Sequence, residues 1–164
     1  MSNKILLIAV LLVTAVFLSG CIFDKDNGTG ADTGIIPDAK LPDGFTFLGS
    51  HDANVEVGNT TLPATEDVYR NSNSEDIYVQ VIESDNPGGL ITRFKLKYKD
   101  ANYEPFKDIW FNGHIATQVK DYITLNGKQE ARYVVIWATE TSMMIVGSSA
   151  AEKDVLDMAI ATGS

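Results

Sequence analysis

An apolar run of 13 residues, positions 5–17, stands near the start of this 164-residue chain and closely precedes its only cysteine, Cys21. The run is too short to cross a bilayer, which takes ~20 apolar residues. Lys4 stands before it and the small residues Ser19 and Gly20 follow it, an order typical of a secretory signal peptide. Because there is one cysteine, no disulfide can form within the chain, and an exported domain must rely on its own core.

Residues 18–21, Leu-Ser-Gly-Cys, resemble the lipobox of prokaryotic lipoproteins, in which an aliphatic residue, a small residue, and Gly or Ala precede Cys. The resemblance covers the first 21 residues. It implies a lipoprotein signal peptide over 1–20 and a diacylglyceryl group on Cys21, the mature N-terminus. Acylation also removes a lone reactive thiol, and two acyl chains hold a protein stably on a membrane. The alternatives are an ordinary signal peptide with a coincidental cysteine, or a short hydrophobic core helix.

The segment after the cysteine predicts a flexible tether over residues 21–43. Gly, Asp, Asn, Thr and Pro dominate positions 24–43, where Ile35 and Ile36 form the only apolar pair. Such a composition buries too little surface to offset its ordering entropy. The alternative is a strand added to the domain through Ile35 and Ile36. The remaining residues, 44–164, are of a length that suits one domain.

The charge of the chain excludes some partners. Lys4 is the only charged residue before Cys21, so the mature chain keeps 12 of the 13 basic and all 22 acidic residues, a formal charge of −10. A protein this acidic repels anionic headgroups and the phosphates of nucleic acid. We therefore expect no nucleic-acid partner, and membrane attachment through the lipid on Cys21.

The domain reads as an antiparallel sheet of five to six strands with two helices, an α+β sandwich. Residues 90–101 fit both a helical stripe and strand alternation, and the helix accounts for more of their apolar residues. Ser149 and Glu152 have capping-box spacing before a second helix that stops near Gly163. Segments with a strand pattern are at 45–48, 51–59, 76–83, 108–111, 114–122, 132–139 and 143–148, with turns at 112–113 and 126–127.

The C-terminal pattern is similar to that of PsbP- and Mog1-like domains. An apolar strand leads to Asn112-Gly113-His114-Ile115-Ala116, then come the strand 133–137, a strand ending in Ser148-Ser149, and a closing helix. The resemblance covers about 60 residues and rests on element order and the NGxxA turn. It implies a small α+β sandwich of the kind found in many prokaryotic lipoproteins, among binding and assembly factors. It transfers no functional residue.

Basic residues gather in one segment and form a candidate partner-docking surface. Positions 38–87 hold ten acids and two bases, whereas positions 88–120 hold three acids and six bases. The docking surface would present Arg93, Lys95, Lys97 and Lys99 to an acidic protein or envelope polymer. The alternative is a solvated helix face whose lysines pair with neighbouring acids.

An aromatic cluster lies in the same part of the sequence and would line a ligand groove or belong to the core. It consists of Tyr98, Tyr103, Phe106, Trp110 and Phe111.

Two sequons are candidate glycosylation sites, at Asn27 and Asn59. No catalytic residue, metal site or cofactor is predicted, since His51 and His114 are the only histidines and no nucleophile elbow or phosphate loop is present.

We expect a non-enzymatic binding or envelope accessory domain on a lipid-anchored protein of the cell membrane that faces outside the cytoplasm. A protein partner fits this reading, with no oligomeric state implied. The alternative is a small-ligand or solute-binding module associated with a membrane transporter.

Overall fold

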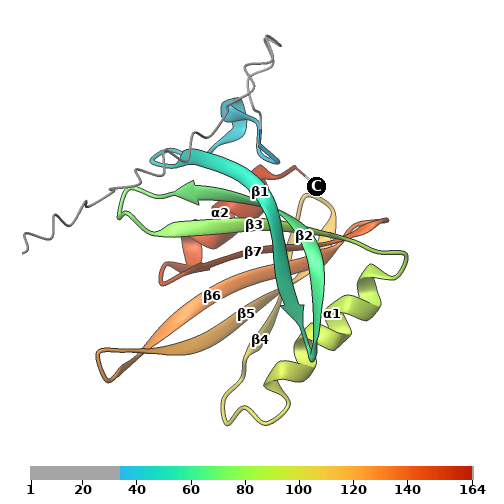
Figure 1. Ribbon diagram of the computed structural model, residues 1–164. Helices are drawn as coiled ribbons and strands as arrows, with labels where there is room; N and C mark the ends of the chain where they lie inside the picture. Colours follow the sequence, from blue (N-terminus) through green and yellow to red (C-terminus); the bar gives the residue numbers. More distant parts are fainter. Residues whose placement is uncertain (1–33, 164) are drawn as a thin grey trace, which may run out of the picture.

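The computed structural model describes residues 34–163, so the predicted signal peptide, Cys21 and Asn27 lie outside the described residues. Seven strands form one antiparallel sheet in the order β1-β2-β3-β7-β6-β5-β4 (Figure 1). The strands are β1 (Thr46–Val57), β2 (Thr60–Arg70), β3 (Asp76–Glu83), β4 (Phe106–Phe111), β5 (His114–Leu125), β6 (Lys128–Ala138) and β7 (Ser142–Ser149). The helices are α1 (Pro87–Lys95) and α2 (Glu152–Ala161), and short 3-10 turns are η1 (Asp38–Lys40) and η2 (Leu96–Tyr98).

The α+β class with one antiparallel sheet is confirmed, but the expected five to six strands are too few. Two expected short strands, 45–48 and 51–59, form the single strand β1, which passes a register shift between Phe47 and Gly49. Strand β2 was not predicted, because Pro63 and several polar residues break its alternation. Pro63 is tolerated where it lies, since that half of β2 pairs with β1 alone and β3 joins only from Thr65 onward.

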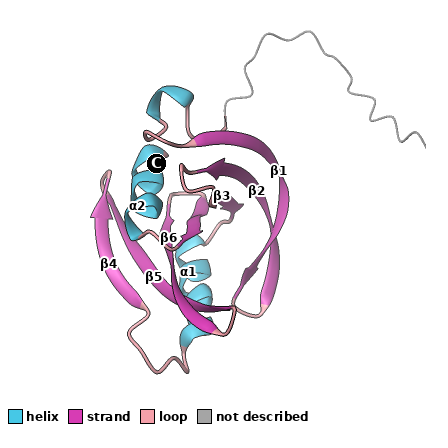
Figure 2. Cartoon of the chain, turned by 90° about the vertical axis from the view of Figure 1, so that its left-hand side faces the viewer, coloured by secondary structure: helices cyan, strands magenta, loops and turns pink. Residues whose placement is uncertain are grey.

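The helices cover opposite faces of the sheet and define two cores. On one face α2 buries Val155, Met158 and Ala159 against the β3, β7 and β6 side chains around Trp137. On the other face α1 buries Leu90 and Phe94 among residues of six strands. The sheet curls around α1, so this second face is concave (Figure 2). Strand β6 lies inside the sheet and is covered on both sides, as its doubly apolar sequence predicts.

The helix reading of residues 90–101 is confirmed for its first half. Helix α1 begins at Pro87, where the Asn86 side chain accepts from the Gly89 amide across 3.0 Å, and it tightens into η2 at Leu96. Leu96 is the apolar residue that the helical stripe leaves out, and its side chain is exposed. The apolar residues spaced 3–4 positions apart therefore decide the structure here, and the alternation of residues 94–99 does not. A helix can turn all of these spaced residues toward the concave face of the sheet.

The expected capping box at Ser149 and Glu152 is wrong. Ser149 is the last residue of β7, and α2 begins at Glu152 with Ala151 at its N-cap and no side-chain cap. The Ser149 hydroxyl instead donates to Glu75 across 2.7 Å and accepts the Ala151 amide across 3.0 Å. Glu152 faces Lys107 at 3.6 Å. The Ser149 hydroxyl thus donates to the carboxylate of Glu75, which is distant in sequence, although its spacing from Glu152 predicted a role as helix cap.

Residues 34–43, placed in the tether by their composition, pack against the domain. Ile36 is 1% exposed and belongs to the α2-side core, and Ile35 packs beside it. No strand forms there, since the segment contains a bend, the 3-10 turn η1 and the start of a turn at Asp43. One deeply buried isoleucine and its backbone hydrogen bonds are enough to hold a stretch that is otherwise polar.

Candidate functional site

A groove of about 290 Å³ opens on the concave face of the sheet beside the C-terminal half of α1. We call it the α1 groove. Its lining side chains come from β1, β3, β5, β6, β7, α1 and η2, so it is a product of the whole fold. They are Val55, Tyr78, Gln80, Phe94, Lys97, Tyr98, Asp121, Ile123, Arg132, Val134 and Ile145, with Gly147 and Ser148.

The floor of the α1 groove is apolar. Ile123, Val134 and Ile145 present side chains from three adjacent strands, with Phe94 on the helix side. Gly147 is needed beside Val134, because a Cβ at position 147 would lie 2.8 Å from a Val134 methyl. Tyr78 and Ile123 remain 37% exposed although they stand on the inner face of the sheet. The helix thus leaves part of the concave face uncovered.

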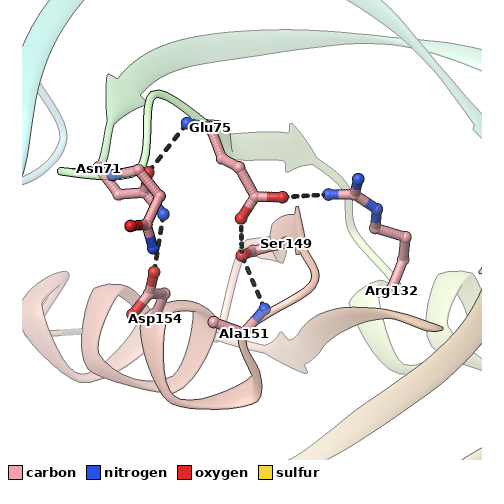
Figure 3. A network of polar contacts seen from close by, with 7 residues as sticks. Asn71, Glu75, Arg132, Ser149, Ala151 and Asp154 are labelled. Atoms are coloured by element: carbon pink, nitrogen blue, oxygen red, sulfur yellow. Dashed lines mark hydrogen bonds and ion pairs between the residues drawn. The ribbon is translucent and has the colours of Figure 1, made fainter. Parts of the chain in front are cut away.

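The groove lining includes Arg132 of β6, whose guanidinium is held in place from the β2–β3 loop. Its Nη1 donates to Glu75 Oε1 across 2.5 Å, and the other carboxylate oxygen of Glu75 accepts from Ser149 (Figure 3). Desolvation opposes ionisation of Glu75, but the hydrogen bonds from Ser149 and Arg132 prevail and lower its pKa. A guanidinium has five N–H donors, and the buried Nε of Arg132 has no hydrogen-bond partner among residues 34–163.

The same loop is fixed to α2 by a second set of bonds. The side-chain oxygen of Asn71 accepts the amides of Asn73 and Glu75 across 3.0 and 2.9 Å. Its amide nitrogen donates to Asp154 in the first turn of α2 across 2.7 Å (Figure 3). Glu75, and through it Arg132, is therefore anchored to β7 and α2 before any ligand arrives.

Asp121 also lines the groove, and it is the direct cross-strand partner of Arg132. Tyr98 donates to one of its oxygens across 3.0 Å and Tyr103 to the other across 3.3 Å, while Lys97 lies 3.6 Å away. Burial and the nearby Asp121 charge raise the pKa of the Tyr98 hydroxyl, so it stays a hydrogen-bond donor. The Asp121 charge is compensated by these neighbours, whereas the Nε of Arg132 has no hydrogen-bond partner among residues 34–163.

The four residues of the predicted docking surface point to different neighbours. Lys97 lies near Asp121, Lys99 lies 3.9 Å from Asp100, and Lys95 lies over the Phe106 ring at 5.3 Å. Arg93 packs beside the Gly58 turn. Only Lys97 belongs to the α1 groove, whereas Lys97 and Lys99 also border a second hollow of about 380 Å³ at Gly58 and Asn59. Partner docking through these residues stays a prediction.

The aromatic cluster is split between the two faces of the sheet. Phe111 packs edge-on against Trp137 in the α2-side core, and Tyr98 packs edge-on against Phe106 on the concave face. Tyr103 pairs with Tyr122. Trp110 is 74% exposed and packs in neither core. A single aromatic groove is therefore not formed, because alternate residues of β4 point to opposite sides.

The remaining candidate residues are placed apart. His51 on β1 faces Glu66 at 3.0 Å, and His114 on β5 lies beside Phe111, so the fold does not bring the histidines together. No group of three potential metal-ligating side chains gathers in residues 34–163. Asn59 is exposed in the β1–β2 turn, and its use as a glycan site stays a prediction. None of the helices between residues 34 and 163 has the length and hydropathy to cross a membrane.

Sequence patterns gave no sign of the α1 groove. Arg132 opens a strand that reads as buried, and Tyr78 and Gln80 lie on the second face of a confirmed strand, β3. These side chains line one groove only because the sheet curls and α1 is too short to cover the whole concave face. Comparisons with protein-family models, with curated proteins and with solved structures find no match for this chain.

Proposed function

We propose that this chain is a membrane-anchored extracytoplasmic lipoprotein, held by lipid on Cys21, whose domain is a non-enzymatic binding module. The Leu-Ser-Gly-Cys lipobox supports the anchor and the location. The order β4 to β7 followed by α2 supports a PsbP- and Mog1-like sandwich. The lysine cluster of α1 and η2 remains a candidate docking surface for an acidic partner.

The α1 groove is the proposed binding site, and its ligand combines an apolar body with an acidic group. The single observation that carries this choice is Arg132, which Glu75 preorganises beside an apolar floor and whose Nε has no partner in the described residues. A guanidinium is suited to carboxylate or phosphate recognition. The volume of about 290 Å³ is at the lower limit of ligand pockets, which fits a small molecule or one or two side chains of a partner.

The second candidate function is a solute-binding module that serves a transporter. The same groove supports it, because a small ligand held by Arg132 needs no protein surface around it. The two functions differ in what the groove holds in the cell, a segment of a protein or a free molecule.

Photo-crosslinking in intact cells tests the site and separates these functions. A photoreactive phenylalanine replaces Tyr78 in the groove or, as the matched control, Tyr122, which is equally exposed at 37% but lies outside the groove. We expect adducts at position 78 and none at 122, with their mass reporting protein or small ligand. Equal labelling at both positions, or none at 78, would contradict the proposed site.

The anchor has its own test. Mass spectrometry of the N-terminal peptide from the native protein should find Cys21 at the new N-terminus with a diacylglyceryl adduct. Cys21→Ala should release the protein from membranes in washed preparations. An unmodified thiol on a protein that retains residues 1–20 would refute the lipoprotein assignment.

A further inference from the structure

The β4–β5 hairpin displays an apolar pair that no core uses. Trp110 and Ile115 are direct cross-strand partners, 74% and 80% exposed, just before and after the Asn112–Gly113 turn. The other tryptophan, Trp137, is completely buried. A pair of large apolar side chains this exposed marks an interaction surface. Tryptophan in particular is favoured at the boundary between membrane and water, where its ring is apolar and its N–H meets solvent.

Three segments meet at the turn that this pair flanks, beside the C-terminal end of α2, although the pair itself projects from the opposite, α1 face of the sheet. The side-chain amide of Asn112 donates to the carbonyl of Ile160 across 2.7 Å. The Lys40 ammonium of η1 lies close to Gly163, 3.1 Å from where a Cβ would stand. In both Figures 1 and 2, η1, the C-terminal end and the β4–β5 turn lie at the same end of the domain. We call this end the anchor pole, because residues 34–40 enter the domain there.

We propose that the anchor pole rests on the lipid bilayer, with Trp110 and Ile115 in the interfacial region. The inference builds on the proposed lipid anchor at Cys21 and adds the orientation of the domain and the residues that contact lipid.

The length of chain between anchor and domain favours this pole over the opposite one. Thirteen steps separate Cys21 from Gly34, and a flexible chain of that length has an end-to-end distance of about 20 Å. A domain of this size is about 36 Å across. Contact through the far pole would require the link to approach its full extension of about 45 Å, whereas contact through the anchor pole leaves it relaxed.

Local charge permits the contact although the protein is acidic. Residues 106–118 carry one base, Lys107, and one acid, Asp108, so the hairpin is formally neutral apart from His114. Ile160, on the last turn of α2, exposes a further apolar side chain, 43% accessible, at the same end of the domain but on the other face of the sheet. A neutral apolar edge on an acidic body fits a bilayer surface without requiring a basic patch.

The test uses the lipidated full-length mature protein in phosphatidylcholine vesicles with or without brominated acyl chains, which quench tryptophan on contact. Vesicle flotation reports the anchor, and emission reports Trp110. We expect flotation together with quenching and a blue shift of Trp110. In Trp110→Phe, which leaves only buried Trp137, flotation should persist and quenching should vanish. Unchanged thermal unfolding of this variant verifies its fold.

A matched control moves the reporter to the other end of β5. Leu125 is 40% exposed, and the 11 residue steps from His114 place it about 36 Å away. In the double variant Trp110→Phe, Leu125→Trp we expect flotation without quenching of the new tryptophan. Quenching equal to that of Trp110 would overturn the orientation.

The remaining outcomes separate the two proposals. Flotation without quenching of Trp110 overturns the bilayer contact and leaves the anchor standing. A blue shift that grows with protein concentration in detergent and ignores brominated lipid assigns the pair to a second copy, and crosslinking of position 110 to another protein assigns it to a protein partner. Each of these refutes the lipid contact. Failure to float refutes the anchor and this inference together.

Discussion

The hydroxyl of Tyr69 donates to Asp67 Oδ2 across 3.0 Å and accepts the backbone amide of Ile36 across 3.1 Å. The same Asp67 oxygen accepts the Ile35 amide, while its other oxygen is buried without a hydrogen-bond partner in the described part of the chain. Two side chains of β2 thus hold the polypeptide where it enters the domain. The carboxylate is 1% exposed and the ring is fully buried, so this clasp depends on every one of its bonds.

Removing the hydroxyl should loosen the clasp. Tyr69→Phe leaves a buried carboxylate and a buried amide short of a partner, so we expect a loss of about 1–3 kcal/mol in the free energy of unfolding. Urea denaturation followed by Trp137 fluorescence measures it. Tyr78→Phe, in which an exposed ring loses its hydroxyl, is the matched control and should change stability by less than about 0.5 kcal/mol. Equal effects in the two variants would contradict the clasp.

Alkaline pH should destabilise the domain through its buried tyrosines. Burial and then the neighbouring carboxylates raise the pKa of Tyr69 and of Tyr98 above the usual value near 10. Above pH 10 the unfolded chain loses these protons while the folded chain keeps them, so stability falls as pH rises. Each tyrosine contributes a slope of up to about 1.4 kcal/mol per pH unit.

The pH dependence can be assigned to one residue by substitution. Urea denaturation between pH 9 and pH 11 should give a shallower slope for Tyr69→Phe than for the parent chain, by a difference that approaches one proton toward pH 11. Tyr78→Phe should keep the parent slope. If Tyr69→Phe retains it as well, the hydroxyl ionises equally in both states and the argument from burial fails.

A side chain at Gly34 should collide with the clasp. A Cβ there would lie 2.5 Å from Asp67 Oδ2 and 2.8 Å from the Tyr69 oxygen. We expect Gly34→Ala to cost about 1–3 kcal/mol and to speed proteolytic cleavage within residues 34–43. Gly88→Ala is the control, since nothing lies within 4 Å of its Cβ position and helix propensity favours Ala by up to ~1 kcal/mol. Resistance of both variants to protease would argue that residues 34–43 do not need this close approach.

Ser149 and Glu152 should respond very differently to substitution. Ser149→Ala removes a donor to Glu75 and an acceptor for the Ala151 amide in a fully buried position, at an expected cost of about 1–3 kcal/mol. Glu152→Ala removes only an exposed ion pair with Lys107, which is worth about 0–1 kcal/mol. Thermal unfolding of both variants decides the matter. A capping box would make the two losses similar, so comparable values would restore it.

Patterns of short range were sufficient for several elements. Strand β3 has the bounds that its alternating β-branched residues predict. Asn112, Gly113, Asn126 and Gly127 all adopt positive φ at the two hairpin turns, as expected of these residue types. Gly163 likewise has φ of +70° directly after the C-cap of α2. In each case the information lies in neighbouring residues, because backbone sterics and side-chain period are local properties.

Local reasoning failed where distant groups competed. Ser149 satisfies the helix-cap pattern, yet Glu75, 74 positions away, takes its hydroxyl. Ile36 lies in a polar stretch, yet it reaches a core that β2, β3 and α2 have to build first. Pro63 argues against a strand, yet β1 alone pairs with that part of β2.

By itself the sequence determined the composition of the chain and the nature of the elements: a lone cysteine preceded by Leu-Ser-Gly, an acidic body, an α+β pattern closed by a helix. Tertiary structure alone decided which side chains became neighbours. The α1 groove arises because a seven-stranded sheet curls around one short helix that leaves part of the concave face open. The clasp on residues 34–36 forms against the opposite, α2-side core, and the Trp110–Ile115 pair stays exposed because neither core reaches it. Burial and strand order are properties of the assembled sheet, and no window of neighbouring residues contains them.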